Sequence, residues 1–350
     1  FMNNHLELLK ANTPMIDLRS PIEFAKGSFP KSLNLPIIEN DEREKIGITY
    51  KHRGNAAAVQ LGNELVSGNL KNSRVLKWKT FIDNNPNAWM YCMRGGQRSG
   101  IAKEWLNDIG INISVVDGGY KALRQTTMEI LGSVHNDQKR WIVLGGRTGS
   151  GKTEILNKFS SSIDLEGHAN HRGSAFGGFD SSQPTSIDFE NCLAIDYVRH
   201  DSNYLFLEDE SRTIGRIAIP NQWYSKMQNS ELVIVEIPIE DRIQNILDDY
   251  IRKPLRQGIP KTDLLLSLRS SLIKIHKRLG GDLFRKIRDK MDKALLDPKN
   301  HKQEEWVGLL LEKYYDPLYD YQIKSKEDRS IYRSDVRGVT NYLSDLESEK

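Results

Sequence analysis

Short apolar runs alternate with amphipathic stretches along most of this chain. In the first part, apolar runs predict three buried strands, at residues 15–19, 88–91 and 113–116. Apolar side chains recur at helical spacing in three other stretches, residues 55–66, 101–109 and 120–130. Strands that alternate with helices indicate a mainly parallel sheet, so residues 1–133 are predicted to form an α/β domain.

The same alternation resumes after a polar linker at residues 134–140. Apolar runs predict further strands at residues 141–144, 204–207 and 232–237, and helices are predicted at 184–199, from about 154 and from about 240. Residues 141–250 therefore form a second predicted α/β domain. Helical patterns dominate residues 251–350, which are predicted to be a helical extension. A length of 350 residues suits two domains and such an extension.

The strongest motif of the chain lies directly after the strand predicted at 141–144. Its spacing is G-x-x-x-x-G-K-T, the pattern of a phosphate-binding loop between a strand and a helix. Glycines let successive backbone N–H groups point into one concavity, and the helix that follows adds the positive end of its dipole. The predicted phosphate or diphosphate ligands are Gly146, Arg147, Thr148, Gly149, Ser150, Gly151, Lys152 and Thr153. The alternative is a glycine-rich turn that carries an incidental lysine.

Cys92 is the second candidate for chemistry. It stands between the predicted strand at 88–91 and a helix, in a polar segment that also contains Arg94 and Arg98. Backbone N–H groups of a curled loop, a helix N-terminus and two guanidinium groups all favour a thiolate, and they suit a tetrahedral oxyanion. We therefore predict that Cys92, Arg94 and Arg98 are catalytic; the alternative is an inert buried thiol. Cys192 lies inside a helical pattern and is predicted to be core.

These segments resemble a known family. Residues 17–19, with Glu23, Phe24 and Gly27, resemble the opening signature of a rhodanese (sulfurtransferase) domain; residues 92–98 resemble its active loop, whose cysteine carries a persulfide, and residues 117–120 its closing element. A rhodanese domain fused to a phosphate-loop domain is a rare arrangement. Together with residues 164–174 and 208–215, it is similar to the bacterial tRNA 2-selenouridine synthases.

That resemblance implies a transferase that acts in two steps on the wobble uridine, in the anticodon stem-loop of certain tRNAs. Geranyl diphosphate first alkylates the sulfur of 2-thiouridine, and selenium from selenophosphate then replaces the geranylated sulfur. The phosphate loop suits the diphosphate leaving group, and we infer from the motif that Lys152 and Thr153 bind it. Cys92 suits the selenium step. No tightly bound cofactor is expected.

A further group of polar residues is predicted to line the pockets at the phosphate loop and at Cys92. Glu208 or Asp209 follows an apolar strand, where phosphate-loop proteins place the acid that holds Mg²⁺, and Thr153 is the second expected Mg²⁺ contact. A solvated acidic turn would look similar. Zinc is not expected without paired cysteines. The second-site candidates are Asp17, Arg19, Glu166, His168, His171, Arg172, Glu208, Asp209 and Arg212.

Composition adds few constraints. The net charge of +3 is too small to indicate a nucleic-acid binder, so any RNA-binding face must be local. The local basic candidates are Arg252, Lys253, Arg256, Lys274, Lys277 and Arg278, although a charged helix face is often only solvated. The two cysteines imply no disulfide framework and favour a cytoplasmic setting, and no apolar run predicts a membrane span.

Two other functions fit parts of this sequence. The first is a small-molecule kinase or ATPase whose rhodanese-like part delivers sulfur or regulates; it predicts ATP turnover without a need for Cys92. The second is a non-enzymatic, nucleotide-responsive module that binds RNA or protein. The presence of Cys92 weighs against the second, because inactive rhodanese-like modules often lack the cysteine.

Overall fold

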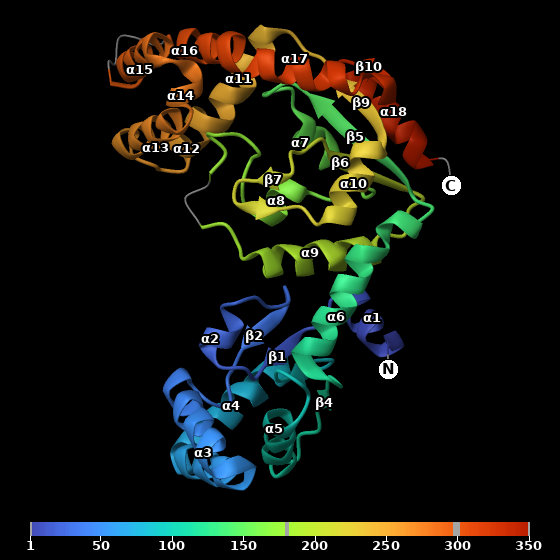
Figure 1. Cartoon of the computed structure of the whole chain (residues 1–350), viewed down its shortest axis with the longest axis vertical. Coiled ribbons are helices and arrows are strands. Elements are labelled where there is room, and N and C mark those ends of the chain that lie inside the picture. The colour runs from blue at the N-terminus through green and yellow to red at the C-terminus, as the bar shows by residue number, and fades with distance from the viewer. Residues whose placement is uncertain (1, 179–181, 297–301, 349–350) are drawn as a thin grey trace. The chain divides into compact units, whose positions relative to one another are not determined.

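A computed structural model describes residues 2–178, 182–296 and 302–348. The chain forms two compact units (Figure 1). The first comprises Phe1–Val134 and Pro184–Asp201, and the second comprises His135–Gln183 and Ser202–Lys350. Among the described residues, no helix is both long and apolar enough to cross a membrane.

The first unit is built on a four-stranded parallel sheet in the order β2-β1-β3-β4. Its strands are β1 (Met15–Asp17), β2 (Ser32–Asn34), β3 (Trp89–Tyr91) and β4 (Ser114–Val115). Its helices are α1 (Met2–Lys10), α2 (Pro21–Phe24), α3 (Asn40–Leu65), α4 (Gly68–Asn84), α5 (Gln97–Asn107), α6 (Gly119–Gly132) and α9 (Ser186–Arg199). The α/β fold predicted for this part is confirmed.

The helices α3, α4 and α5 share an apolar core with the sheet. The rings of Trp78 and Trp105 stack with centroids 6.0 Å apart, and the Trp78 indole N–H donates to the Leu35 carbonyl. The helix predicted at 55–66 is the second half of α3. Gly54, at φ +81°, separates it from a first half that the apolar pattern did not predict.

Helix α9 lies in the middle of the second α/β segment of the sequence, yet it belongs to the first unit. The Asn191 side chain donates to the Ser28 carbonyl at 2.7 Å, and the Ser28 N–H donates to Asp188 at 2.8 Å. A Cβ on Gly27 would lie 2.3 Å from Ile187, so only glycine permits this approach. The compact units therefore depart from the predicted domain boundaries at this helix.

The second unit also has a four-stranded parallel sheet, in the order β10-β9-β5-β6. Its strands are β5 (Arg140–Gly146), β6 (Tyr204–Glu208), β9 (Glu231–Val235) and β10 (Ser330–Ser334), and a small antiparallel pair is formed by β7 (Thr213–Ile214) and β8 (Ile217–Ala218). Its first helices are α7 (Lys152–Leu156), α8 (Leu165–Ala169), α10 (Asn221–Asn229) and α11 (Ile239–Leu247). Because β5 and β6 are almost wholly buried, they read as continuous apolar runs.

Helices follow α11 for most of the remaining chain, as predicted. They are α12 (Lys253–Arg256), α13 (Lys261–Lys274), α14 (His276–Leu279), α15 (Gly281–Leu296), α16 (Gln303–Leu310), α17 (Asp316–Ser325) and α18 (Val336–Ser348), with a π-helical turn at Leu311–Tyr315. Figure 1 shows α12–α15 gathered in orange to one side of the sheet of this unit. Strand β10, however, returns the chain to the sheet, which the purely helical prediction missed.

Candidate functional sites

Cys92 directly follows β3, and its thiol is buried. Its Sγ lies 3.3 Å from the hydroxyl of Ser99, whose oxygen also lies 3.0 Å from the Gly96 carbonyl oxygen, so the one hydroxyl hydrogen can be donated to either. Burial by itself would raise the pKa of Cys92, but hydrogen bonds from the Ser99 hydroxyl and from the N–H groups of Arg94, Ser99 and Gly96 hold it below its ordinary value. The loop therefore favours the thiolate, as a nucleophile requires.

Two neighbouring glycines let the Cys92 loop curl. A Cβ on Gly119, at φ +60°, would lie 2.3 Å from the Cys92 carbonyl oxygen. Gly95, at φ +63°, packs against the Gly118 N–H and the Val116 carbonyl in the same way. The Tyr120 N–H then donates to the Cys92 carbonyl at 2.9 Å. The segment at 117–120 thus shapes the loop by close backbone contact.

The two arginines of this loop differ in their surroundings. Arg98 forms a bidentate pair with Glu23, at 2.7 and 3.2 Å, and Arg43 approaches the same carboxylate at 3.3 Å. Although burial opposes it, the Arg98 hydrogen bond and charge lower the pKa of Glu23 to about 2. Arg94 is exposed. Arg94 is therefore the loop guanidinium open to a ligand, whereas Arg98 is held in position by Glu23.

Asp17 and Arg19 are placed inside the fold. Their side chains are 0% and 1% exposed and pair at 2.6 Å. The Arg19 guanidinium also donates to the Gly27 carbonyl at 2.8 Å and lies 3.7 Å from the centroid of the Tyr120 ring. These contacts account for both charges without a ligand, so they brace the first unit instead of forming the second site that the sequence suggested.

The phosphate loop runs from the end of β5 into α7. Gly149 and Gly151 adopt φ values of +82° and +80°. A Cβ on Gly149 would lie 2.8 Å from the Arg242 carbonyl oxygen, and the Arg242 guanidinium donates to the Thr148 carbonyl at 2.9 Å. Lys152 donates to the Gly146 carbonyl at 3.0 Å. The loop is therefore preformed, with α11 packed behind it.

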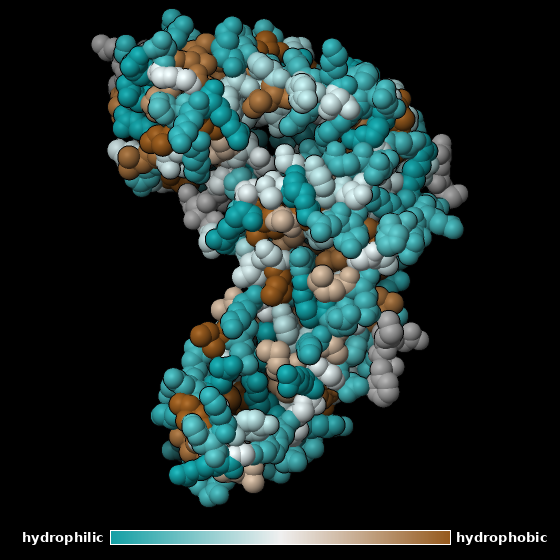
Figure 2. Space-filling view, viewed as in Figure 1, coloured by the Kyte–Doolittle hydropathy of each residue, from teal (hydrophilic) through white to brown (hydrophobic). Residues whose placement is uncertain are grey.

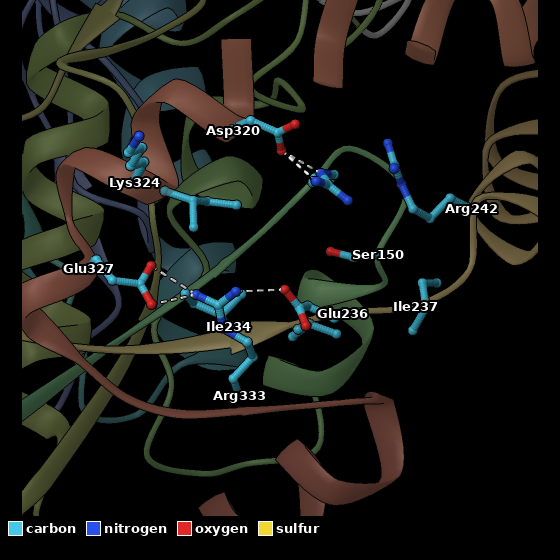
Figure 3. A pocket seen from close by; sticks show the side chains of 12 residues that line it. Ser150, Ile234, Glu236, Ile237, Arg242, Asp320, Lys324, Glu327 and Arg333 are labelled. Carbon is cyan, nitrogen blue, oxygen red and sulfur yellow. Dashed lines mark hydrogen bonds and ion pairs between the residues drawn. The ribbon is translucent and has the colours of Figure 1, made fainter. Parts of the chain in front are cut away.

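Arg147 departs from its predicted role. Its guanidinium pairs with Asp320 at 2.5 Å, and the residue lines a cavity of about 210 Å³ that lies behind the loop. Figure 3 shows Asp320, Arg242 and Ser150 on the walls of this cavity. The side chain of Arg147 thus anchors the loop to α17, and a bound phosphate would meet the other loop residues.

Three carboxylates converge on the open side of the phosphate loop. Oxygens of Glu166, Glu208 and Glu210 lie within 4.8 Å of one another. Burial, and then the charge of a neighbouring glutamate, raise the pKa of Glu166 and Glu208 to about 8 and that of Glu210 to about 7. Burial would lower the pKa of Lys152, but Tyr319 and these three carboxylates raise it.

Glu208 is the member of this cluster that contacts the loop. It is 1% exposed, its Oε1 accepts a hydrogen bond from Thr153 at 2.5 Å, and its Oε2 is buried without a hydrogen-bond partner. An orphaned carboxylate oxygen beside a threonine hydroxyl fits an oxygen-liganded cation such as Mg²⁺. Asp209 does not join them, because Lys326 binds both of its oxygens at 2.7 Å.

These groups surround a cavity of about 820 Å³. Residues 148–153 of the loop form one wall, with His171 and Arg172 from the polar segment beside them. Aromatic and aliphatic side chains also line the cavity and are here called the tyrosine wall: Tyr250, Ile275, Tyr314, Tyr315, Leu318 and Tyr319. The cavity therefore offers both anion-binding groups and apolar contacts, which suits a ligand with both characters.

Comparison with known proteins decides the family. A family model described as the tRNA 2-selenouridine synthase AAA domain matches residues 139–350, and a rhodanese-like domain model matches residues 3–126. The tRNA 2-selenouridine synthase of Shewanella frigidimarina is 40% identical over 350 residues, which cover 96% of this chain and 95% of that protein. Those of a Sulfurovum species and of Photobacterium profundum are 42% and 39% identical, each over at least 95% of both chains. The chain belongs to the tRNA 2-selenouridine synthase family.

Membership of the tRNA 2-selenouridine synthases confirms that this chain is an enzyme and that its first part is rhodanese-like. The remaining candidate residues divide into those that line the large cavity and those that do not. His171 and Arg172 line the large cavity, whereas His168 is not among its lining residues. Arg212 donates to the Ile219 carbonyl and to Asn221, beside the β7–β8 pair, and also lies outside the lining.

The basic RNA-binding candidates of this synthase divide into residues that pair with polar neighbours and residues at the cavity. Arg252 donates to Gln244, while Lys253 and Arg256 pair with Asp249 and Asp248 at 2.6 and 3.0 Å. In contrast, Lys274, Lys277 and Arg278 are exposed, and two of them, Lys274 and Arg278, line the large cavity. The end of α13 and the short α14 therefore carry the basic surface beside the cavity.

Sequence reasoning missed Ser99, Glu210, Tyr250 and Tyr319 of this synthase. Ser99 stands in the first turn of α5 after the loop, a position from which a hydroxyl can point back at the thiol. Glu210 belongs to the same acidic turn as Glu208, so the pattern that indicated Glu208 could also have indicated Glu210. Tyr250 and Tyr319 come from separate helical turns, and no local pattern signals that they meet.

Proposed function

We propose that this enzyme converts the wobble 2-thiouridine of tRNA to 2-selenouridine through an S-geranyl intermediate. In the first step, the sulfur attacks C1 of geranyl diphosphate, the C1–O bond breaks and diphosphate leaves. In the second, selenium derived from selenophosphate bonds to C2 of the base, the C2–S bond breaks and geranylthiol leaves. The amphipathic cavity at the phosphate loop is the observation that carries this proposal.

The first step is assigned to that cavity. Backbone N–H groups of residues 148–153 and the Lys152 ammonium face the position of a diphosphate, where they stabilise the charge that the leaving group gains. Tyr250, Tyr315 and Leu318, which also line this cavity, provide apolar contact for a ten-carbon chain. The thiouridine of the tRNA enters through the opening of the cavity. Its sulfur then meets the C1–O bond of geranyl diphosphate, between the bound diphosphate and the prenyl chain.

Thr153 and Glu208 are the residues that would hold a Mg²⁺ ion in this cavity. The unpartnered oxygen of Glu208 supports that assignment. Bound there, the ion would neutralise charge on the departing diphosphate. Lys152 balances part of the negative charge of the three glutamates in either case.

The second step is assigned to the Cys92 loop. The lowered pKa of Cys92 favours its thiolate, and the loop N–H groups with Arg94 suit the phosphate of a selenium donor. Ser99 orients and stabilises the thiolate. Cys92 therefore acts on selenium, and the phosphate loop acts on the geranyl group.

The test uses the purified protein and an anticodon stem-loop that contains 2-thiouridine. Geranyl diphosphate and selenophosphate are supplied separately and together, and nucleosides are identified by mass spectrometry. An S-geranyl product with geranyl diphosphate alone, converted to 2-selenouridine when both are present, is the expected result. A tyrosine wall can also stack on a purine. Phosphate release from ATP with no change in the RNA would therefore assign a kinase-like function.

A further inference from the structure

The rhodanese-like unit contains a second cavity, of about 550 Å³, between α3 and α5. Gly54 breaks α3, and its two halves turn back alongside each other: a Cβ on Gly62 would lie 3.5 Å from Ile46. The inner faces of these halves and one face of α5 form the walls. A rhodanese-like sheet alone does not require such a chamber, so the presence of the chamber needs an explanation.

The walls of this chamber are mostly apolar. Ile46, Val59, Ile101 and Trp105 line it, and two more lining residues, Ile48 and Tyr50, remain 54% and 59% exposed. Figure 2 shows hydrophobic side chains at the surface over α3. Apolar surface of this kind is stabilised when a ligand removes it from water.

The chamber reaches the start of α5, the helix that directly follows the Cys92 loop. Gln97 and Arg98, the first residues of α5, belong to its lining, and the next residue is the Ser99 that contacts the Cys92 thiol. Cys92 also belongs to the same buried apolar cluster as Ile37, which lines the chamber. A group in the chamber would therefore lie next to chemistry at Cys92.

The charged residues that line the chamber are predominantly basic. Arg43, Lys51 and Arg98 line it, with Glu44 as the acidic exception. Glu23 fixes Arg43 and Arg98 by ion pairs at 3.3 and 2.7 Å. A lining that combines apolar and cationic side chains is complementary to an apolar chain that is attached to a polyanion.

We propose that this chamber binds the prenyl chain of the S-geranylated tRNA base during the selenium step. The inference rests on the geranylated intermediate of the proposed function. A cavity of about 150 Å³ accommodates benzene, so a chamber of 550 Å³ has room for a ten-carbon chain. Holding the chain places the C2–S bond beside Cys92, and geranylthiol leaves into the chamber when selenium displaces it at C2. The enzyme thus distinguishes an alkylated base from an unmodified 2-thiouridine.

The test compares two synthetic stem-loops, one with S-geranyl-2-thiouridine and one with S-methyl-2-thiouridine. Each is given selenophosphate and the full-length protein, and kcat/KM for selenation is measured by mass spectrometry. We expect the wild type to prefer the geranyl substrate by about 100-fold, because only the long chain fills the chamber. The variants Gly47→Leu and Val59→Trp, which fill the chamber, should lose most of that preference and keep the rate on the methyl substrate.

Gly132→Leu is the matched control for Gly47→Leu. Both glycines lie in helices of this unit, an added Cβ meets no atom within 4 Å at either, and Gly132 lies outside the chamber lining. The control should retain the wild-type preference. Equal rates of the wild type on both substrates, or an unchanged preference in both chamber variants, would overturn the inference while the proposed function stands. Failure to convert either alkylated base, with no S-geranyl product formed from 2-thiouridine, would instead refute the proposed function.

A mapping experiment needs no variant. A stem-loop whose thiouridine carries a photoreactive prenyl analogue is irradiated with the wild-type protein, and labelled peptides are identified. Labels within residues 43–66 and 97–105 support the chamber. Labels confined to the tyrosine wall of the other cavity, at residues 250 and 314–319, would place the chain there in both steps and reject this inference.

Discussion

Thr153 donates its hydroxyl hydrogen to Glu208, with 2.5 Å between the two oxygens. The bond joins the first turn of α7 to the last residue of β6. It uses only one oxygen of Glu208, and the other is buried without a partner. Such an arrangement costs free energy unless a proton or a cation compensates it, so we expect the pair to be completed when the diphosphate substrate binds.

We predict that Glu208→Gln lowers geranyl transfer by about 10²-fold, because it removes the carboxylate that would hold Mg²⁺ against the diphosphate. The dependence of the rate on Mg²⁺ concentration should weaken in parallel. Glu154→Gln is the matched control: Glu154 lines the same cavity, but its side chain is 71% exposed. Equal losses in both variants would indicate a general effect of charge, and a normal rate in Glu208→Gln would remove the residue from the site.

Mutations at the phosphate loop and at Cys92 should affect different reactions. Lys152→Ala should slow geranyl transfer by about 10²- to 10³-fold and leave selenation of a pre-geranylated stem-loop near the wild-type rate, because the proposal assigns this lysine to the diphosphate alone. Cys92→Ser should abolish selenation and preserve geranyl transfer. Both reactions are followed on the same RNA by mass spectrometry. Loss of both activities in a folded Cys92→Ser variant would contradict this division.

The pH dependence of Cys92 should report its hydrogen bond to Ser99. Alkylation by iodoacetamide follows the thiolate, so its rate rises as pH passes upward through the pKa of Cys92, which lies below that of an ordinary cysteine. Ser99→Ala removes a donor to the thiolate and should move the midpoint to higher pH, whereas Ser99→Thr keeps a hydroxyl and should restore it. The measurement uses a Cys192→Ser background, in which Cys92 is the sole thiol. An identical midpoint in the alanine variant would show that the backbone N–H groups alone set the pKa.

Sequence patterns predicted the strands that are mostly buried, such as β1, β3, β5, β6 and β9, whereas the half-exposed β2 was expected to be a loop. The run at 141–144 forms the centre of β5, and the loop that follows it adopts the predicted strand–loop–helix context. Strand β10 was missed because Ser330, Arg333 and Ser334 give it a polar, half-buried edge that no apolar run reveals. It is recognisable only from its pairing with β9.

Local spacing predicted the loops that carry chemistry but not the partners that complete them. Oxygens of Glu166 and Glu208 lie within 4.8 Å of each other, although α8 and β6 lie far apart in the chain. Asp209 seemed as good a metal ligand as Glu208 until Lys326, from the end of the chain, was seen to neutralise it. Ion pairs between distant residues decide which acid of such a turn is available, and no single stretch of sequence contains them.

The closing glycines of the Cys92 loop should tolerate no side chain. Gly119→Ala would place a methyl group 2.3 Å from the Cys92 carbonyl oxygen at φ +60°, and should lower the free energy of unfolding of this unit by about 2 kcal/mol or more. Gly100→Ala is the control, since Gly100 lies in α5 with open space around it and should gain about 0.5–1 kcal/mol. Protection of Cys92 from a thiol reagent during urea titration, again in the Cys192→Ser background, reports the unit concerned. Equal protection in both variants would contradict the packing argument.

The basic residues beside the large cavity should contribute more to RNA binding than the basic residues of α12. Lys274 and Arg278 are exposed at its edge, so the double variant Lys274→Ala/Arg278→Ala should weaken binding of the anticodon stem-loop about 10-fold at 0.1 M salt. The slope of log K against log salt should fall by about 1.5, because two phosphate contacts disappear. Lys253→Ala/Arg256→Ala removes the same formal charge, but Asp248 and Asp249 already pair with these side chains, and the loss should stay below about threefold. Equal losses would show that net charge attracts the RNA, and a larger loss in the second variant would move the RNA-binding surface to α12.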